Sequence, residues 1–283
     1  MRAGGPEPYR IAAMKVGPLD IRPGGPLFLL AGPCVIEDDE LPFTVARSLK
    51  ATTDALGMPF VFKASFDKAN RTSLDGFRGP GPEEGIALLA KVRDEVGVPV
   101  MTDVHEPAHC ELAAGKIDLI QIPAFLSRQT DLLLAAGRSG CAVNIKKGQF
   151  MAPWDIGHSI DKVTSTGNEA VMVTDRGVSF GYNTLVSDMR AIPEMQRFGV
   201  PVVFDATHSV QKPSAAGGKT GGDRTMAPVL ARAAVAAGCD GVFSETHPDP
   251  DKALSDGPNM IPLDELPAVL ATLQRIRAAV EGS

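Results

Sequence analysis

Eight short apolar segments recur along this 283-residue chain, bounded by glycine, proline or polar residues. They are hydrophobic almost without a break, which is typical of parallel strands that helices cover on the outside. Amphipathic stretches that end in glycine separate them, such as residues 82–97 and 225–238. This alternation predicts an α/β fold, the (β/α)8 TIM barrel, with a short N-terminal extension. The predicted strands span residues 27–32, 60–66, 98–104, 119–124, 142–148, 170–177, 200–208 and 241–247.

No break in composition marks a linker inside this pattern. The length allows two domains of about 150 residues each, but a single α/β barrel also runs to about 250 residues. We therefore expect one catalytic barrel over residues 27–283. Residues 1–26 are rich in Gly and Pro, and we expect them to form an arm or a cap over the bottom of the barrel.

The charge balance limits the partners. With 28 Lys and Arg against 34 Asp and Glu, the net charge of −6 provides no excess positive field for nucleic acid or anionic lipid. No apolar run approaches the roughly 20 residues that span a bilayer, and the opening residues lack a segment of signal-peptide type. We expect a cytoplasmic protein without a nucleic-acid or membrane partner.

Polar side chains gather where the predicted strands end. In a barrel all C-terminal strand ends open onto one face, where this fold builds its active sites. Each residue alone is compatible with an ordinary loop position, but eight such positions favour a common pocket. These residues are Cys34, Lys63, Asp103, Gln121, Lys146, Arg176, His208 and Glu245.

Closure of the barrel makes the eighth strand a neighbour of the seventh and the first. His208, Glu245 and Cys34 then come from three adjacent strand ends, and Asp256 can fold back from the loop after the eighth strand. A thiolate, an imidazole and two carboxylates suit a divalent ion such as Zn²⁺, Fe²⁺ or Mn²⁺, and do not choose among them. The competing interpretation of Cys34 is a buried small hydrophobe.

The other three cysteines and two short motifs have simpler interpretations. Cys110, Cys141 and Cys239 are assigned to packing, because wide spacing in a chain of this size argues against a disulfide framework. The run HEPAH (105–109) matches a zinc-protease pattern, but its proline is expected to start a helix after the first histidine. GGKT (217–220) lacks the first glycine of a P-loop and is interpreted as a mobile loop, a candidate lid.

Residues 62–73, FKASFDKANRTS, concentrate hydrogen-bond donors and positive charge around one strand end. Such a density is unusual in a chain of net negative charge and predicts a site for phosphate or carboxylate. A solvated basic loop is the alternative. Lys146 and Arg176 are expected to face the same pocket, so two anionic groups could be held at once. Cations there would also stabilise negative charge that develops in a transition state.

Long motifs in a fixed order resemble the 3-deoxy-D-manno-octulosonate 8-phosphate synthases. The resemblance runs from about residue 27 to residue 265 and implies condensation of phosphoenolpyruvate with D-arabinose 5-phosphate and water. The 3-deoxy-D-arabino-heptulosonate 7-phosphate synthases, which use erythrose 4-phosphate, typically have a KPRT-type motif where this chain has KANRTS. The motifs that carry the resemblance are AGPCVIE, FKASFDKANRTS, RGPG, TDVHEP, IQIPAFLSRQTDLL, NIKKGQF, DRG, SFGYN, FDATHSVQ and ETHPDPDKALSDGPNM.

The resemblance also implies roles for individual residues. The metal ligands would be Cys34, His208, Glu245 and Asp256, as in the metal-dependent branch; the metal-independent branch has Asn at the position of Cys34. Of these, Cys34, His208 and Asp256 are also catalytic candidates, and Lys68 is a candidate proton donor. Phosphoenolpyruvate would be held by Lys63, Ser65, Lys68, Gln121, Lys146 and Arg176. The sugar phosphate would be held by Asn70, Arg71, Thr72 and Asp103, with Arg128 of a neighbouring subunit in a homotetramer.

Two further functions remain open on the sequence. A Schiff-base aldolase on the same barrel would use Lys63 or Lys146 as its nucleophile and would be inactivated by borohydride with a carbonyl substrate. A non-catalytic phosphosugar-binding barrel is also structurally possible, because fold does not determine function.

Overall fold

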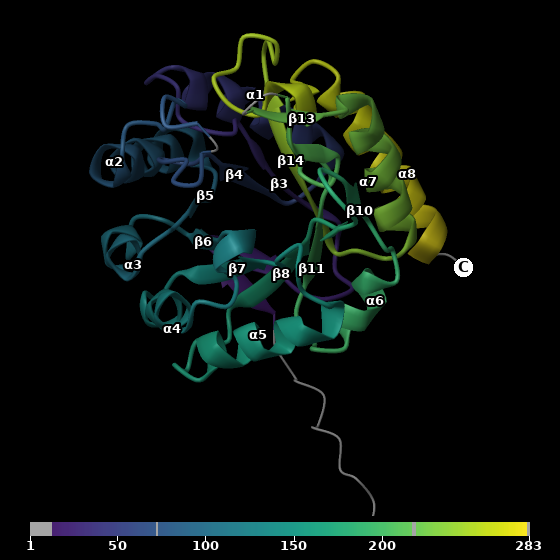
Figure 1. Ribbon diagram of the computed structural model, residues 1–283, viewed down its shortest axis with the longest axis horizontal. Helices are drawn as coiled ribbons and strands as arrows, with labels where there is room; N and C mark the ends of the chain where they lie inside the picture. The colour runs from purple at the N-terminus through teal and green to yellow at the C-terminus, as the bar shows by residue number, and fades with distance from the viewer. Residues whose placement is uncertain (1–12, 72, 217–218, 282–283) are drawn as a thin grey trace, which may run out of the picture.

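Eight parallel strands close into a barrel in the computed structural model, which describes residues 13–71, 73–216 and 219–281. Each strand pairs in parallel with the next, and β14 pairs with both β11 and β3, which closes the ring (Figure 1). The predicted barrel is confirmed. Its strands are β3 (Phe28–Gly32), β4 (Phe60–Lys63), β5 (Val100–Asp103), β6 (Leu119–Ile122), β7 (Ala142–Lys146), β8 (Val171–Asp175), β11 (Val202–Asp205) and β14 (Gly241–His247).

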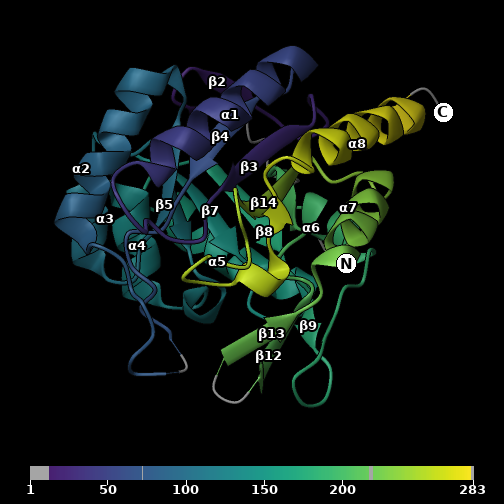
Figure 2. The ribbon, with the colours of Figure 1, turned by 90° about the horizontal axis from the view of Figure 1, so that it is seen from above.

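Helices surround this ring on the outside, as Figures 1 and 2 show. The predicted helix over 82–97 is α2 followed by the π-helical turn η1 (Arg93–Gly97), and that over 225–238 is η4 (Arg224–Met226) followed by α7. Gly97 and Gly238 end these stretches with φ of +73° and +92°, a conformation that favours glycine. The helices are α1 (Leu41–Leu56), α2 (Pro82–Val92), α3 (Pro107–Ala113), α4 (Thr130–Arg138), α5 (Gly157–Thr164), α6 (Ala191–Gln196), α7 (Ala227–Ala236) and α8 (Leu266–Glu281).

Several strands are shorter than predicted, and the difference lies mainly at their C-terminal ends. The segment predicted as 60–66 ends as a strand at Lys63, and that predicted as 200–208 ends at Asp205. The residues that follow leave the sheet and form the loops of the C-terminal face. Apolar and β-branched content alone does not distinguish the last ladder residue from the first loop residue.

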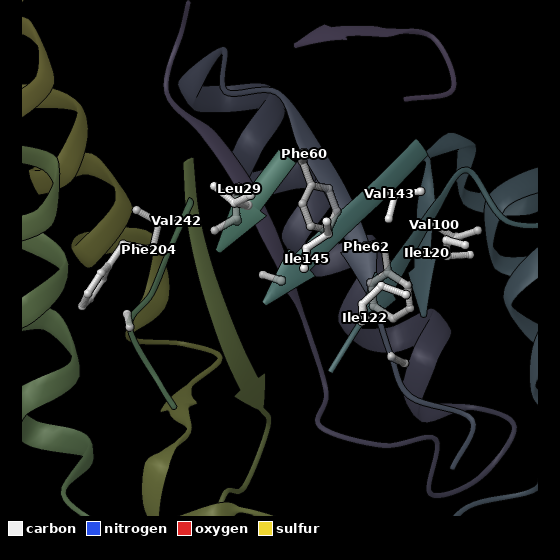
Figure 3. Close-up of a cluster of buried hydrophobic side chains, with 14 of the residues drawn as sticks. Leu29, Phe60, Phe62, Val100, Ile120, Ile122, Val143, Ile145, Phe204 and Val242 are labelled. Atoms are coloured by element: carbon white, nitrogen blue, oxygen red, sulfur yellow. The ribbon is translucent and has the colours of Figure 1, made fainter. Parts of the chain in front are cut away.

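Alternation along the strands builds two layers of core. Outward-facing residues such as Leu29, Phe62 and Ile120 pack against the helices, and Figure 3 shows part of this layer. Inward-facing residues fill the barrel itself, so the lower barrel is a packed core rather than a channel. The inward-facing strand residues are Phe28, Leu30, Val61, Met101, Leu119, Ala142, Met172, Val203 and Phe243.

A short antiparallel hairpin precedes the barrel, formed by β1 (Met14–Val16) and β2 (Leu19–Ile21). Its apolar side chains belong to the same buried cluster as the barrel interior. Its turn residue Gly17 lies against Pro99 and Asp118, which directly precede β5 and β6, so the hairpin lies at the N-terminal end of the barrel. Residues 1–12 of the predicted arm lie outside the described residues, and the domain boundaries stay a prediction.

The opposite end carries small sheets within its loops. β9 (Val178–Ser179) pairs with β10 (Leu185–Val186), and β12 (Gln211–Ala216) pairs with β13 (Lys219–Gly222), in a hairpin that projects from the barrel in Figure 2. β15 (Ile261–Pro262) extends β14, and short helical turns η2 (Ala124–Leu126), η3 (Pro153–Ile156) and η5 (Gly257–Asn259) complete the loops. The first two residues of GGKT lie outside the described residues, and the lid stays a prediction.

The structure also bears on the cysteines, the HEPAH segment and the expected absence of membrane-spanning segments. All four cysteines are free and buried, and Cys110 lies in α3 as expected. That helix begins at Pro107, so His105 precedes it and the protease interpretation of HEPAH stays rejected. Among the described helices, none combines the length and apolar character needed to cross a bilayer.

The hairpin packing generates a stability prediction. Ile21→Ala removes a side chain that is 3% exposed and opens a cavity at the bottom of the barrel, which should lower the free energy of unfolding by about 2–4 kcal/mol. Lys15→Ala on the same hairpin is the control, because Lys15 forms only an exposed ion pair with Asp20. Denaturant unfolding checks both variants; equal stabilities would contradict the packing role of the hairpin.

Candidate active site

A cavity of about 1140 Å³ opens at the C-terminal end of the barrel. Seven of the eight predicted strand-end residues line it, and the eighth, Cys34, lies fully buried beside it. The convergence of these positions in one pocket is therefore observed. Strand alternation accounts for it, because these side chains occupy the same inward-facing positions as the apolar residues below them. The lining residues from the predicted set are Lys63, Lys68, Asn70, Arg71, Asp103, Gln121, Lys146, Arg176, His208, Glu245 and Asp256.

Three of the four predicted metal ligands form a compact group. Ligand atoms of Cys34, Glu245 and Asp256 all lie within 4.8 Å of one another. The Cys34 thiol lies 2.9 Å from Ser255 Oγ and 3.3 Å from Asp256 Oδ2. Asp256 has a left-handed backbone with φ of +50°, which turns its carboxylate back over Cys34. The loop after β14 thus folds back as expected.

His208, the fourth predicted ligand, approaches this group through one ring nitrogen. Its Nε2 lies 3.5 Å from Glu245 Oε2, and its Nδ1 lies 2.8 Å from Asp205 Oδ2. The carboxylate of Asp205 favours the ring proton at Nδ1, which leaves the Nε2 lone pair facing Glu245. A histidine oriented this way has the usual arrangement of a metal ligand.

The residues present fit a divalent cation. Glu245 Oε2 is buried and accepts no hydrogen bond from the described part of the chain. Burial raises the pKa of the Cys34 thiol well above its ordinary value, and the nearby Glu245 carboxylate adds to this effect. A buried sulfur, an imidazole and two carboxylates form a donor set for zinc or a similar transition metal. A cation there would compensate the carboxylates and favour the thiolate.

Buried lysines are held by carboxylates at the bottom of the cavity. Lys63 Nζ donates to Glu245 Oε1 and to the carbonyl oxygen of Cys34, both at 2.8 Å. Lys146 Nζ lies 2.5 Å from Asp205 Oδ2 and 3.7 Å from the centre of the Phe243 ring. These contacts offset the cost of placing charge where water is excluded.

Lys68 reaches the cavity from the loop after β4, and Arg176 reaches it from the end of β8. Lys68 Nζ lies 3.8 Å from Glu245 Oε1, and Arg176 donates to the carbonyl oxygen of His208 at 3.2 Å. Arg176 also donates to the side-chain oxygen of Gln211 in β12, while its Nε is buried without a partner in the described part of the chain. The guanidinium therefore keeps donor capacity for a ligand.

The electrostatic environment sets the charge of these groups. Burial lowers the pKa of Lys68, but the surrounding Cys34, Glu245 and Asp103 outweigh this effect and raise it overall. For Lys146 burial dominates and the pKa is lowered, although Asp205 acts in the opposite direction. Burial acts to raise the pKa of Glu245, yet Lys63, His208 and Lys68 hold it well below its usual range.

Asp103 and Ser65 form a second polar group at the bottom of the cavity. The Ser65 hydroxyl donates to Asp103, and His105 Nε2 lies 3.3 Å from the other carboxylate oxygen. Ser65 itself is fully buried and does not line the cavity. Ser65 thus differs from the other residues predicted to hold phosphoenolpyruvate, which line the cavity.

The residues predicted to hold the sugar phosphate are only partly brought together. Asn70 and Arg71 line the cavity, and Arg71 Nη2 is buried without a partner in the described residues. Thr72 lies outside the described residues. Arg128 is exposed after η2 and does not line the cavity of its own chain.

Two functional candidates were missed by the sequence analysis. Asp205 is fully buried and contacts both Lys146 and His208. Glu37 accepts a hydrogen bond from the Leu254 amide at 3.0 Å, which ties the loop after β3 to the loop that carries Asp256. The signal for Asp205 was its place as the last residue of an apolar strand, the same place that Asp103 has in β5.

The role of Asp205 generates a second prediction. Asp205→Asn removes the charge that compensates buried Lys146, so the free energy of unfolding should fall by about 3–5 kcal/mol. The matched control is Asp54→Asn, which breaks an exposed ion pair with Lys50 and should change stability by less than about 1 kcal/mol. If denaturant unfolding gave the same change in the free energy of unfolding for both variants, the buried pair would contribute no more to stability than the exposed pair.

Comparisons with known proteins show the family of this chain. The model of the DAHP synthetase I family matches residues 14–281. The chain is 55% identical over 264 residues to the 2-dehydro-3-deoxyphosphooctonate aldolase of Geobacter metallireducens, covering 93% of this chain and 97% of the relative. It is 58% identical over 249 residues to the protein of that name from Nitratidesulfovibrio vulgaris, covering 88% and 91%. The chain therefore belongs to the DAHP synthetase I family, in which it groups with the 2-dehydro-3-deoxyphosphooctonate aldolases.

Proposed function

We propose that the protein condenses phosphoenolpyruvate with D-arabinose 5-phosphate and water, giving 3-deoxy-D-manno-octulosonate 8-phosphate and inorganic phosphate. The names of the relatives describe an eight-carbon, 2-keto, 3-deoxy acid phosphate. Phosphoenolpyruvate contributes three carbons and a pentose phosphate contributes five, which gives the eight carbons of that acid. The product would serve lipopolysaccharide sugar biosynthesis. The observation that carries the proposal is the convergence of six Lys and Arg side chains on one cavity, in a protein of net charge −6.

Two anionic substrates suit the distribution of donors in this cavity. Lys63, Lys146 and Arg176 lie at the strand ends, where phosphoenolpyruvate would present its carboxylate and phosphate. Asn70 and Arg71 lie on the loop after β4 and would hold the phosphate of the sugar. The aldehyde would then lie between the two groups, near Asp103, which would contact a sugar hydroxyl.

Cys34, His208, Glu245 and Asp256 would hold one divalent ion of the zinc, iron or manganese class. When bound, the ion supplies Lewis-acid polarisation of the aldehyde oxygen or of a water molecule. Asp205 would keep the His208 ring in the ligating orientation, and Glu37 would keep the Asp256 loop over Cys34.

The bond changes follow from these positions. C3 of phosphoenolpyruvate attacks the aldehyde carbon, and the aldehyde oxygen takes up a proton. Water adds to the cationic C2 centre and loses a proton, which leaves a hydroxyl group on C2. This hydroxyl then loses its proton as the C2=O bond forms and the C2–O bond to phosphate breaks, and the departing phosphate takes up a proton. The raised pKa of Lys68 keeps it an ammonium ion, which would stabilise negative charge on the substrates and is a candidate to pass a proton to the aldehyde oxygen.

The assembly and location belong to the same proposal. Arg128 would complete the sugar-phosphate site of a neighbouring subunit in a homotetramer, since it is exposed and does not line the cavity of its own chain. Exposed aromatic residues on nearby loops, Phe125, Phe150 and Trp154, support a contact between subunits there. The single catalytic domain over 27–283 and the cytoplasmic location stay predictions from the sequence.

A Schiff-base aldolase is less well supported by the same geometry. Lys63 is held by Glu245, and Lys146 by Asp205, each within 2.8 Å. A nucleophilic lysine has to be neutral, whereas both carboxylates favour the ammonium form. The lowered pKa of Lys146 makes it the candidate that a borohydride experiment would address.

The direct test is phosphate release from phosphoenolpyruvate with either sugar phosphate. We expect release with D-arabinose 5-phosphate, loss of activity after exhaustive chelation, and recovery with divalent ions. Preference for erythrose 4-phosphate would instead indicate the seven-carbon synthase. Release with neither sugar under any metal would favour a non-catalytic phosphosugar-binding barrel.

A pair of cysteine variants tests whether Cys34 is a ligand of the proposed metal ion. Cys34→Ser should lower metal retention during chelator challenge, because serine is a poor replacement for a thiolate ligand. Cys141→Ser is the control, since Cys141 is also buried but lies next to Ile117, away from the cavity. Full activity of Cys34→Ser after chelation would contradict the metal role.

A further inference from the structure

Three polar side chains form a hydrogen-bonded row across neighbouring strands of the barrel. Gln121 lies in β6, Asn144 in β7 and Thr174 in β8, and all three are buried. Each comes two residues after an apolar residue that fills the barrel interior, so all three point inward. Of the three, only Gln121 lines the cavity.

The hydrogen bonds of this row all run the same way, with each residue donating to the next from Thr174 to Gln121. Thr174 Oγ1 donates to Asn144 Oδ1 at 2.7 Å, and Asn144 Nδ2 donates to Gln121 Oε1 at 3.1 Å. The carbonyl end of the Gln121 amide is thus occupied inside the barrel. Its Nε2 group donates to no residue in the described part of the chain and remains available to the cavity.

This direction matters because a glutamine amide has two different ends. The NH2 group donates hydrogen bonds to an anion, whereas the carbonyl oxygen repels one. Lys63, Lys146 and Arg176 line the same cavity, and in the absence of an anion such cations attract the carbonyl end. A free amide would therefore turn the wrong way for an anionic substrate.

We propose that Thr174 and Asn144 act as positioning residues that hold the Gln121 amide with its NH2 group toward an anionic oxygen of phosphoenolpyruvate. The inference rests on the proposed function, which assigns Gln121 to that substrate. Neither Thr174 nor Asn144 touches the substrate; they act through Gln121. Fully satisfied buried networks of this kind specify one side-chain arrangement.

The first variant is Thr174→Val, which removes the hydroxyl at nearly constant volume. The KM for phosphoenolpyruvate should rise about tenfold, because an oriented hydrogen bond to a charged group is lost, while kcat and the KM for the sugar stay within about twofold. Thr174→Ser should restore the KM. Thr102→Val is the matched control, since Thr102 on β5 is equally buried but its hydroxyl has no partner in the described residues.

A second variant reverses the row instead of interrupting it. Asn144→Asp accepts from Thr174 as before but offers no NH2 group to Gln121. The Gln121 amide would then donate to the new carboxylate and turn its carbonyl oxygen to the cavity. Binding of phosphoenolpyruvate, measured directly by calorimetry, should weaken at least as much as in Thr174→Val. Unchanged binding would overturn the proposal.

A double-mutant cycle separates this inference from the function on which it rests. If Gln121→Ala leaves the KM for phosphoenolpyruvate unchanged, the assignment of Gln121 to that substrate fails. If Gln121→Ala weakens binding, Thr174→Val should add nothing in the Gln121→Ala background. Two outcomes would overturn the proposal and show that Thr174 is only a structural residue. One is an equal effect of Thr174→Val on binding in both backgrounds. The other is that Thr174→Val impairs kcat, both KM values and the melting temperature together.

Discussion

Two buried carboxylates hold together the charges on which the site depends. Glu245 contacts Lys63 and His208, and Asp205 contacts Lys146 and His208, so one connected group joins β4, β14, β11 and β7. Isolated ions in such an environment would be too costly, and the lysines would lose their protons. Because these charges have partners, the barrel can present ammonium groups and an oriented imidazole to the cavity although the side chains themselves are buried.

The same arrangement explains how the C-terminal end of the barrel can bind both a cation and anions. On one side, the Cys34 thiol, the carboxylates of Glu245 and Asp256 and the Nε2 atom of His208 suit a cation. On the other side, Lys146, Arg176 and the NH2 group of Gln121 suit anions. Glu245 lies at the boundary, because one oxygen binds Lys63 and the other faces the proposed metal ligands. A substrate held by the cations would thus have its reacting atoms next to the ion.

Much of this could be predicted from the sequence, for definite physical reasons. Parallel strands buried on both faces appear as continuous apolar runs, and closure of eight such strands brings residues as distant as Cys34 and Glu245 together. The motif resemblance then suggested roles for the strand-end residues. The hairpin at the bottom of the barrel was expected only as an arm or a cap, because short Gly- and Pro-rich segments have no strong period.

Other features could not be predicted, because they depend on which side chain faces which neighbour. Asp205, Asn144 and Thr174 each look like an isolated polar residue in an apolar strand, and only the packed barrel pairs them with Lys146, Gln121 and one another. Glu37 stood inside a recognised motif, but its bond to the Leu254 amide crosses more than two hundred residues. The proposed role of Arg128 requires a second copy of the chain.

We propose that a metal ion and phosphoenolpyruvate lie side by side at the strand ends. The most direct measurement is anomalous diffraction at the metal edge from crystals of the metal-loaded, active protein soaked with phosphoenolpyruvate. We expect one metal peak among Cys34, His208, Glu245 and Asp256, with the substrate's anionic groups against Lys63, Lys146 and Arg176. A metal peak elsewhere, or phosphoenolpyruvate bound away from these cations, would contradict it.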